Sequence, residues 1–165
     1  MLKAVAYTLF VLLALAVGTG MGLVLAAREN LPEVELLENY KPSTITRIYD
    51  VNNEVIAEFY QQRRTIIPLS SIPDPLIKAL LAVEDVHFYK HGGVDLKGIT
   101  RAMLTNLRAR RIKEGGSTIT QQLSKLLFLT PERSIMRKTK EAILALRIES
   151  RYTKEEILEL YLNQV

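Results

Sequence analysis

The chain has 165 residues, 48% of them hydrophobic, with a formal net charge of +4 and no cysteine. This length suits one modest globular domain, and the lack of cysteine excludes disulfides, thiolate nucleophiles and thiolate metal sites. With only two histidines, His87 and His91, a histidine-rich metal site is not expected either.

The first predicted element is a membrane-spanning helix. Residues 4–27 contain no charged side chain and number 24, against the roughly 20 that cross a bilayer as a helix. A cleaved signal peptide has an apolar core of only about 7 to 15 residues, so a retained anchor is favoured. Lys3 favours a cytoplasmic tail at residues 1–3, although Arg28 weakens the asymmetry. The remaining chain would then lie outside the membrane.

A polar connector over residues 28–42 leads into a β-like region. Two segments flank the turn-forming triplet VNN and are expected to pair as strands: STITRIYD and EVIAEFY. A third short extended run is RRTIIPL, at residues 63–69. From Pro75 onward the pattern is helical, and no linker is long enough to separate two domains, so we expect one domain over residues 43–165.

The first helix of this domain carries two adjacent carboxylates, Glu84 and Asp85. Winding the helix at 100° per residue places Glu84 inside an apolar stripe, between Leu80 and Ile77. Asp85 points the other way, beside Lys78. We therefore expect Asp85 to be solvated and Glu84 to be partly desolvated, which would raise the pKa of Glu84 toward that of a general base. The structural alternative is a boundary glutamate that reaches water.

Two features separate this helix from the next motif. The segment HGG is expected to end the helix, with Gly92 or Gly93 in the left-handed conformation that other residues disfavour. The run RARRIK, at residues 108–113, concentrates positive charge. In a membrane-anchored chain this run is better interpreted as a solvated face beside acidic phospholipid than as a nucleic-acid site.

The stretch EGGSTITQQLSK, at residues 114–125, combines a flexible entry with a polar helix face. Thr118 and Gln121 have the spacing of a capping box, so a helix is expected to begin near Thr118. One side of it would carry Thr118, Gln121, Gln122 and Lys125. These groups suit a ligand with negative charge and many hydroxyls, such as a phosphorylated sugar, although a solvated helix face is the simpler alternative. The glycines are not a nucleotide P-loop, since no Lys-Ser or Lys-Thr follows them.

The next helix is expected to begin at Thr130, with Pro131 in its first turn. Within RKTKE, Arg137 and Lys138 precede Glu141 by four and three residues, so both cations should flank that carboxylate. This is either a surface ion-pair cluster or a basic cradle for an anionic leaving group.

The last helix, TKEEILELYLN, opens with a second capping box, Thr153 to Glu156. It is expected to bury Ile157, Leu160 and Tyr161 and to be mainly structural.

Four segments resemble successive motifs of the peptidoglycan glycosyltransferase domain, glycosyltransferase family 51, of class A penicillin-binding proteins and monofunctional transglycosylases: EDVHFYKHGG, GGSTITQQLSK, RKTKE and KEEILELYLN. The resemblance covers about residues 43–165. It implies a mainly α, lysozyme-like lobe with a short β-like segment at its start and a small membrane-associated jaw, preceded by one transmembrane helix. The implied activity is polymerisation of lipid II into glycan strands of the bacterial cell wall, by inverting glycosyl transfer with release of undecaprenyl pyrophosphate.

The resemblance also assigns roles to residues. Glu84 would be the general base on the 4-hydroxyl of the acceptor sugar. Glu141 matches a second glutamate, thought to orient basic groups or a divalent ion near the leaving group. The residues expected to bind substrate are Ser117, Thr118, Gln121, Gln122, Lys125, Arg133, Arg137 and Lys138. No cofactor is required on this interpretation, and a divalent cation such as magnesium is considered only at Glu141.

The implied partners are lipid II, the growing glycan strand, membrane phospholipid and other cell-wall synthesis proteins, but no nucleic acid. The implied location is the bacterial cytoplasmic membrane, crossed once, with the catalytic domain on its outer side. Because family members continue beyond the YLN segment, the domain is expected to be incomplete at its C-terminal end, which would leave several large side chains of the last helix partly exposed.

Two other classes of function stay open. A noncatalytic, membrane-anchored module that binds lipid-linked glycan or a cell-wall partner would use the polar strip, formed by Thr118, Gln121, Gln122 and Lys125, without needing Glu84. A lytic enzyme of lysozyme-like fold would leave the anchor and the basic cluster without a purpose.

Overall fold

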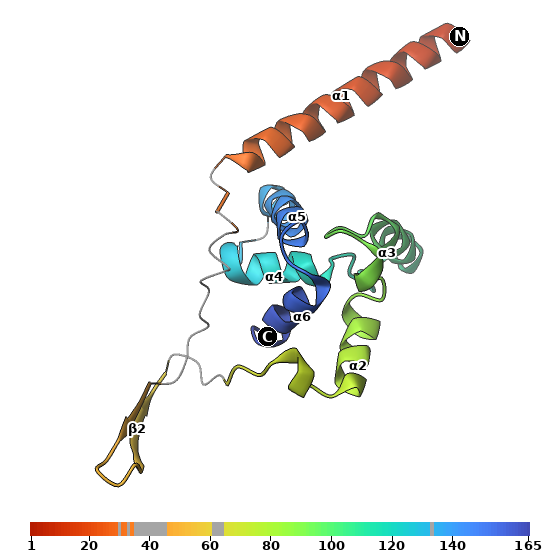
Figure 1. Ribbon diagram of the computed structural model, residues 1–165. Helices are drawn as coiled ribbons and strands as arrows, with labels where there is room; N and C mark the ends of the chain where they lie inside the picture. The colour runs from red at the N-terminus through yellow and green to blue at the C-terminus, as the bar shows by residue number, and fades with distance from the viewer. Residues whose placement is uncertain (30, 33, 35–45, 61–64, 133) are drawn as a thin grey trace.

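The computed structural model describes residues 1–29, 31–32, 34, 46–60, 65–132 and 134–165. Figure 1 shows a mainly helical chain with one short hairpin, as the sequence predicts. The elements, with η for 3-10 helix, are α1 (Leu2–Arg28), β1 (Thr46–Tyr49), β2 (Val55–Phe59), η2 (Leu69–Ser71), α2 (Asp74–Glu84), η3 (Phe88–Lys90), α3 (Leu96–Ala109), α4 (Ile119–Phe128), α5 (Ile135–Glu149) and α6 (Lys154–Leu162).

Helix α1 is the apolar helix expected at the N-terminus. Its stretch Lys3–Arg28 is long and apolar enough to cross a membrane, and nearly all its large side chains are exposed. Near its C-terminal end Ala27 is buried, and α1 contacts α5 (Figure 1). Most of the predicted connector, residues 28–42, lies outside the described residues.

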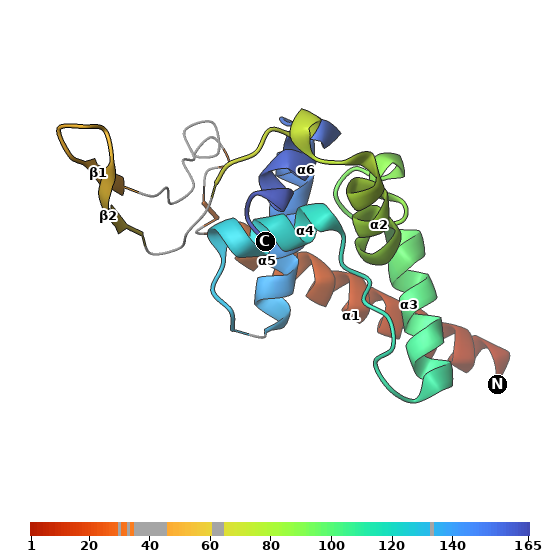
Figure 2. The same cartoon turned by 90° about the horizontal axis from the view of Figure 1, so that it is seen from below.

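Strands β1 and β2 form an antiparallel hairpin that projects away from the helices (Figure 2). The turn between them is the predicted one: Asn53 adopts a positive φ of 68°, and the Asp50 carboxylate accepts hydrogen bonds from the backbone of Asn52 and Glu54. The third extended run adds no strand in its described part, residues 65–68. Its residues 63–64 are outside the described chain.

The core lies where α4, α5 and α6 pack against one another. Its buried apolar side chains are Val34, Phe88, Ile119, Leu123, Leu144, Ile148, Ile157, Leu158 and Tyr161. The expectation that several large side chains of the last helix stay partly exposed is therefore wrong for Ile157, Leu158 and Tyr161, because α4 and α5 already cover that side of α6. Leu160 and Leu162 are partly exposed.

Helix α6 also fixes the chain that leads into α2. The Asn163 side chain accepts a hydrogen bond from the Ile67 backbone N–H and donates one to the Ile67 carbonyl, at 2.8 and 2.9 Å. One turn earlier, the Glu159 carboxylate accepts from the Leu69 N–H at 2.8 Å. These two polar side chains, four residues apart at the C-terminal end of α6, thus clamp the segment that leads into α2, which forms no strand in its described part.

Candidate active site

The two adjacent carboxylates behave in the opposite way to the sequence expectation. Helix α2 ends at Glu84, and Asp85 leaves the helical conformation with φ of −160°. Asp85 is only 7% exposed, whereas Glu84 is exposed. The helical wheel failed for Asp85 because α2 ends at Glu84, and it failed for Glu84 because the apolar stripe is not covered: Leu76 and Val83 are 56% and 82% exposed. The Asp85 carboxylate is instead drawn to the N-terminus of α4, where backbone N–H groups and the helix dipole favour an anion.

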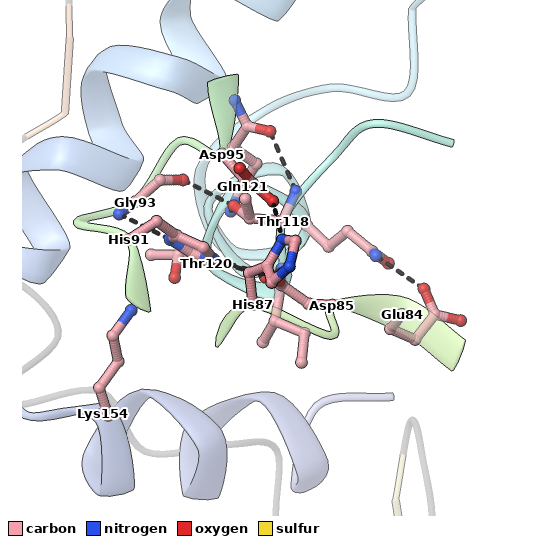
Figure 3. Close-up of polar contacts among 12 residues, drawn as sticks. Glu84, Asp85, His87, His91, Gly93, Asp95, Thr118, Thr120, Gln121 and Lys154 are labelled. Carbon is pink, nitrogen blue, oxygen red and sulfur yellow. Dashed lines mark hydrogen bonds and ion pairs between the residues drawn. The ribbon is translucent and has the colours of Figure 1, made fainter. Parts of the chain in front are cut away.

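A buried hydrogen-bond network surrounds Asp85 (Figure 3). Its carboxylate accepts from the Ile119 N–H at 3.0 Å and from His91 Nε2 at 2.9 Å. His91 Nδ1 in turn accepts from the Gly93 N–H at 3.2 Å. Because Nδ1 accepts and Nε2 donates, the neutral imidazole satisfies both contacts.

Gly93 joins this network to α4 and is the predicted left-handed glycine, with φ of +103°. Its carbonyl accepts a hydrogen bond from Thr118 Oγ1 at 2.6 Å. A Cβ atom at this position would lie 2.8 Å from the Ala145 carbonyl oxygen. Only glycine therefore fits between the turn and α5.

A second polar cluster is centred on Glu149, the last residue of α5. Glu149 accepts hydrogen bonds from Thr120 Oγ1 at 2.6 Å and from Lys154 Nζ at 2.7 Å. The Lys154 ammonium also lies 4.4 Å from the centre of the Phe88 ring. The cluster thus joins α4, α5 and α6, and its lysine lies over the ring of Phe88, three residues after Asp85 in the chain.

The polar strip of α4 divides into an inner and an outer part. Thr118 and Gln121 form the predicted capping box, but both are buried, and their side chains bond to backbone groups within the fold. Direct contact of these two residues with substrate stays a prediction. Gln122 and Lys125 face outward, and Gln122 Nε2 donates to the Glu84 carboxylate at 2.8 Å. The strip therefore reaches the predicted base through Gln122.

Helix α5 begins later than expected. Its N-cap is Ser134, whose hydroxyl accepts from the Arg137 N–H at 3.0 Å, so the prediction of a start at Thr130 with Pro131 in the first turn is wrong. Ser134 and Thr130 have the same local capping ability, and the structure places the cap at Ser134. Further along α5, Ser124 Oγ of α4 donates to the Glu141 carbonyl.

The basic cluster forms around Glu141 as its spacing predicts. Glu141 is 2% exposed; one carboxylate oxygen pairs with Arg137 and the other with Lys138 Nζ at 2.8 Å. Lys138 Nζ also donates to Ser117 Oγ at 2.6 Å. Burial, with Arg137 and Lys125 nearby, lowers the pKa of Lys138. A bound anion would reduce the electrostatic repulsion between these cations. Arg133, also expected here, lies outside the described residues.

Two cavities meet at Ser117. The larger, of about 450 Å³, is lined by the end of α2, part of α3 and the loop that precedes α4, and Glu84 lies on its wall. The smaller, of about 130 Å³, is lined by Ser117, Gln122, Lys125, Arg137, Lys138 and Glu141. Glu84 thus lies on the wall of one cavity, and the cations lie on the wall of its neighbour. Gln122 lines the second cavity and is bonded to Glu84.

Glu141 is a poor ligand for a divalent cation in this arrangement. Both of its oxygens are already paired with the two cations. Within the described part of the chain, no group of three His, Asp or Glu side chains could hold a metal ion.

Sequence reasoning missed the roles of Asp85, His91 and Tyr161. Tyr161 was expected only as a core residue, yet its hydroxyl donates to Gln122 Oε1 at 3.2 Å. No local signal reveals this contact, because the two residues are 39 positions apart. Asp85 and His91 share one motif, but a helical wheel cannot show that both turn inward.

Comparison with known proteins shows which family the chain belongs to. A family model described as Transglycosylase matches residues 52–165. The chain is 44% identical to penicillin-binding protein 1A of Aquifex aeolicus over 165 residues, which is 100% of this chain and 23% of that protein. It is 44% identical over 151 residues to penicillin-binding protein 1A of Escherichia coli, covering 92% of this chain and 18% of the relative. The chain thus spans less than a quarter of the length of these curated relatives.

Proposed function

The chain belongs to the transglycosylase family, and on that premise we propose that it polymerises lipid II into peptidoglycan glycan strands. One observation carries the proposal: Gln122 links the exposed carboxylate of Glu84 to a cavity lined by Lys125, Arg137 and Lys138. Glycosyl transfer from a pyrophosphate donor needs a base at the attacking hydroxyl and cations at the leaving group. In this chain, Glu84 and the three cations lie on the walls of two neighbouring cavities.

In the proposed reaction, Glu84 takes the proton from the 4-hydroxyl of the acceptor sugar. The resulting oxygen nucleophile forms a bond to the anomeric carbon of the growing strand while the bond from that carbon to pyrophosphate breaks. Attack from the face opposite the leaving group inverts the configuration. The electron pair of the broken bond leaves on undecaprenyl pyrophosphate, whose charge the three cations stabilise.

Buried Glu141 has a different role in this proposal. Its two ion pairs hold Arg137 and Lys138 toward Ser117, so that both cations are in place before charge develops. Because these cations meet the leaving group directly, the proposed reaction requires no metal or other cofactor.

We further propose that α1 anchors the enzyme in the bacterial cytoplasmic membrane, with the catalytic lobe on the outer side. Lys3 at the start of α1 favours a cytoplasmic N-terminus. A lipid-linked substrate stays in the bilayer, and a tethered enzyme meets it there. Exposed basic residues at 108, 110, 111 and 113 would contact acidic phospholipid.

Polymerisation of lipid II by the full chain in detergent or liposomes tests the proposal. Glu84→Gln removes the base but keeps size and hydrogen bonding, so turnover should fall by roughly 100-fold or more while lipid II still binds. The matched control is Glu54→Gln, an exposed glutamate in the hairpin. Near-normal turnover of Glu84→Gln would refute the role of Glu84. Binding of lipid II by the wild-type chain without any polymer would support a noncatalytic module instead.

A further inference from the structure

A chain of two hydrogen bonds leads from the core to the carboxylate of Glu84. The Tyr161 hydroxyl donates to Gln122 Oε1 at 3.2 Å, and Gln122 Nε2 donates to Glu84 Oε2 at 2.8 Å. We propose that Tyr161 is a positioning residue for Glu84 and acts through the side-chain amide of Gln122. This inference rests on the proposed function of Glu84 as general base.

Tyr161 decides which end of the amide faces Glu84. An amide side chain can present either its oxygen or its NH₂ group to a neighbour. A protonated phenol that donates its hydrogen is satisfied only by the amide oxygen. With the oxygen of Gln122 turned toward Tyr161, the NH₂ group must point to the carboxylate.

The phenol is held firmly and stays protonated. Tyr161 is 4% exposed, and its ring belongs to the core with Ile157 and Leu158 on the same helix. Burial, and then the negative charge of Glu84, raise the pKa of Tyr161 above its ordinary value of 10.0. At neutral pH the hydroxyl therefore keeps the hydrogen that it donates to Gln122, and the packing of α6 against α4 sets its position.

The arrangement prepares Glu84 for proton abstraction. Donation from Gln122 occupies one carboxylate oxygen and leaves the other free to accept a proton. Without the hydroxyl, the amide is free to rotate and to present its oxygen to Glu84, which would favour the protonated form. The other ionisable groups on the walls of this cavity are Asp85, Asp95, Arg101, Lys113 and Glu114. None of them changes when the Tyr161 hydroxyl is removed.

Tyr161→Phe removes that hydroxyl and keeps the ring. In the polymerisation assay we expect kcat to fall about tenfold with KM within about twofold, and the acid limb of the pH–rate profile to move up by about half a pH unit. Tyr152→Phe is the matched control, since Tyr152 is a half-buried tyrosine next to the same helix, away from Gln122. Gln122→Ala should reproduce the shift of the acid limb, and adding Tyr161→Phe to it should change nothing further, because the two residues act in series.

A measurement without turnover separates this inference from the proposed function. The carboxyl carbon of Glu84, assigned by its loss in Glu84→Gln, is titrated by ¹³C NMR in the full chain, and thermal melts verify that each variant is folded. We expect the midpoint to move to higher pH in Tyr161→Phe and Gln122→Ala but not in Tyr152→Phe. An unchanged midpoint in both Tyr161→Phe and Gln122→Ala would overturn the inference, whatever their activity. If the midpoint moves and the wild-type chain makes no polymer, the link from Tyr161 to Glu84 holds and the proposed function fails.

Discussion

Asp85 caps a helix that it does not belong to: its carboxylate accepts the backbone N–H of Ile119, the first residue of α4, at 3.0 Å across 34 positions of sequence. Glu84, immediately before Asp85, is bonded to Gln122 on the same helix. Two consecutive carboxylates thus tie the end of α2 to the first turns of α4, one from inside the fold and one from its surface. The buried carboxylate of Asp85 fixes the end of α2 against α4. The exposed carboxylate of Glu84 is therefore available for the proposed chemistry.

Asp85→Asn should therefore be costly although Glu84 stays intact. The Ile119 N–H and His91 Nε2 both meet Oδ2, so the amide oxygen can stay there, but the NH₂ group then faces the donor His91 Nε2 at 3.1 Å and the negative charge at the N-terminus of α4 is lost. We expect a loss of about 2 kcal/mol in the free energy of unfolding and a fall of at least about tenfold in polymerisation. Thermal melts and lipid II turnover measure the two effects. Asp74→Asn, at the exposed start of α2, is the control, and equal behaviour of the two variants would contradict the capping role.

Gly93→Ala should destabilise the fold, whereas Gly92→Ala should not. Position 93 has φ of +103° and leaves only 2.8 Å between a Cβ atom and the Ala145 carbonyl oxygen, while position 92 has nothing within 4 Å. We expect Gly93→Ala to cost about 2 to 4 kcal/mol, and Gly92→Ala less than about 1 kcal/mol. Chemical denaturation of both variants provides the comparison. Similar midpoints would show that the turn can move away from α5.

Removal of one cation from the basic cluster should weaken binding of a pyrophosphate-like ligand. Lys138→Ala or Lys125→Ala is expected to reduce the affinity for a fluorescent phosphoglycolipid by about 1.5 to 3 kcal/mol, and affinity should fall as salt rises. Lys140→Ala is the control, because Lys140 lies on the same helix but lines a different surface depression. Unchanged affinity in both cluster variants would place the ligand elsewhere.

Asp95 should add stability that disappears in acid. The backbone N–H of Gly98, and then His87 at 2.8 Å, lower the pKa of Asp95 below its ordinary value of 3.8. A lowered carboxylate pKa stabilises the fold above the unfolded value, near pH 4, and this contribution is lost as the pH falls through the folded value. The difference in melting temperature between wild type and Asp95→Asn should be constant above about pH 5 and shrink below about pH 4. A difference that persists at pH 3 would argue against this origin.

Features set by neighbouring residues could be predicted from the sequence. Both capping boxes, Thr118 with Gln121 and Thr153 with Glu156, form as expected, because each joins residues three positions apart. The hairpin turn and the pairing of Glu141 with the cations before it are equally local. In each case the chain needs no distant partner to select the geometry.

Features set by distant residues could not be predicted in this way. The end of α2 depends on a backbone N–H 34 positions away, so a periodic pattern through Asp85 carried no information about it. The start of α5 at Ser134 rather than Thr130 could not be chosen from the sequence either, because both side chains can cap a helix. Recognition of the motifs placed Glu84 and Asp85 side by side, but it did not show which of the two is buried.

The clamp of α6 on residues 67–69 has a consequence for synthesis on the ribosome. Its hydrogen bonds join residues 90 and 96 positions apart, so the entry to α2 stays unfixed until nearly all of the described helices have been made. At about 5 to 20 residues per second, that interval lasts on the order of 5 to 20 seconds. During it the entry to α2 lacks its clamp, and until α4 has been made Asp85 also lacks the Ile119 N–H that donates to it. A nascent chain stalled before α6 would therefore expose the Glu84 segment as a target for chaperones and proteases.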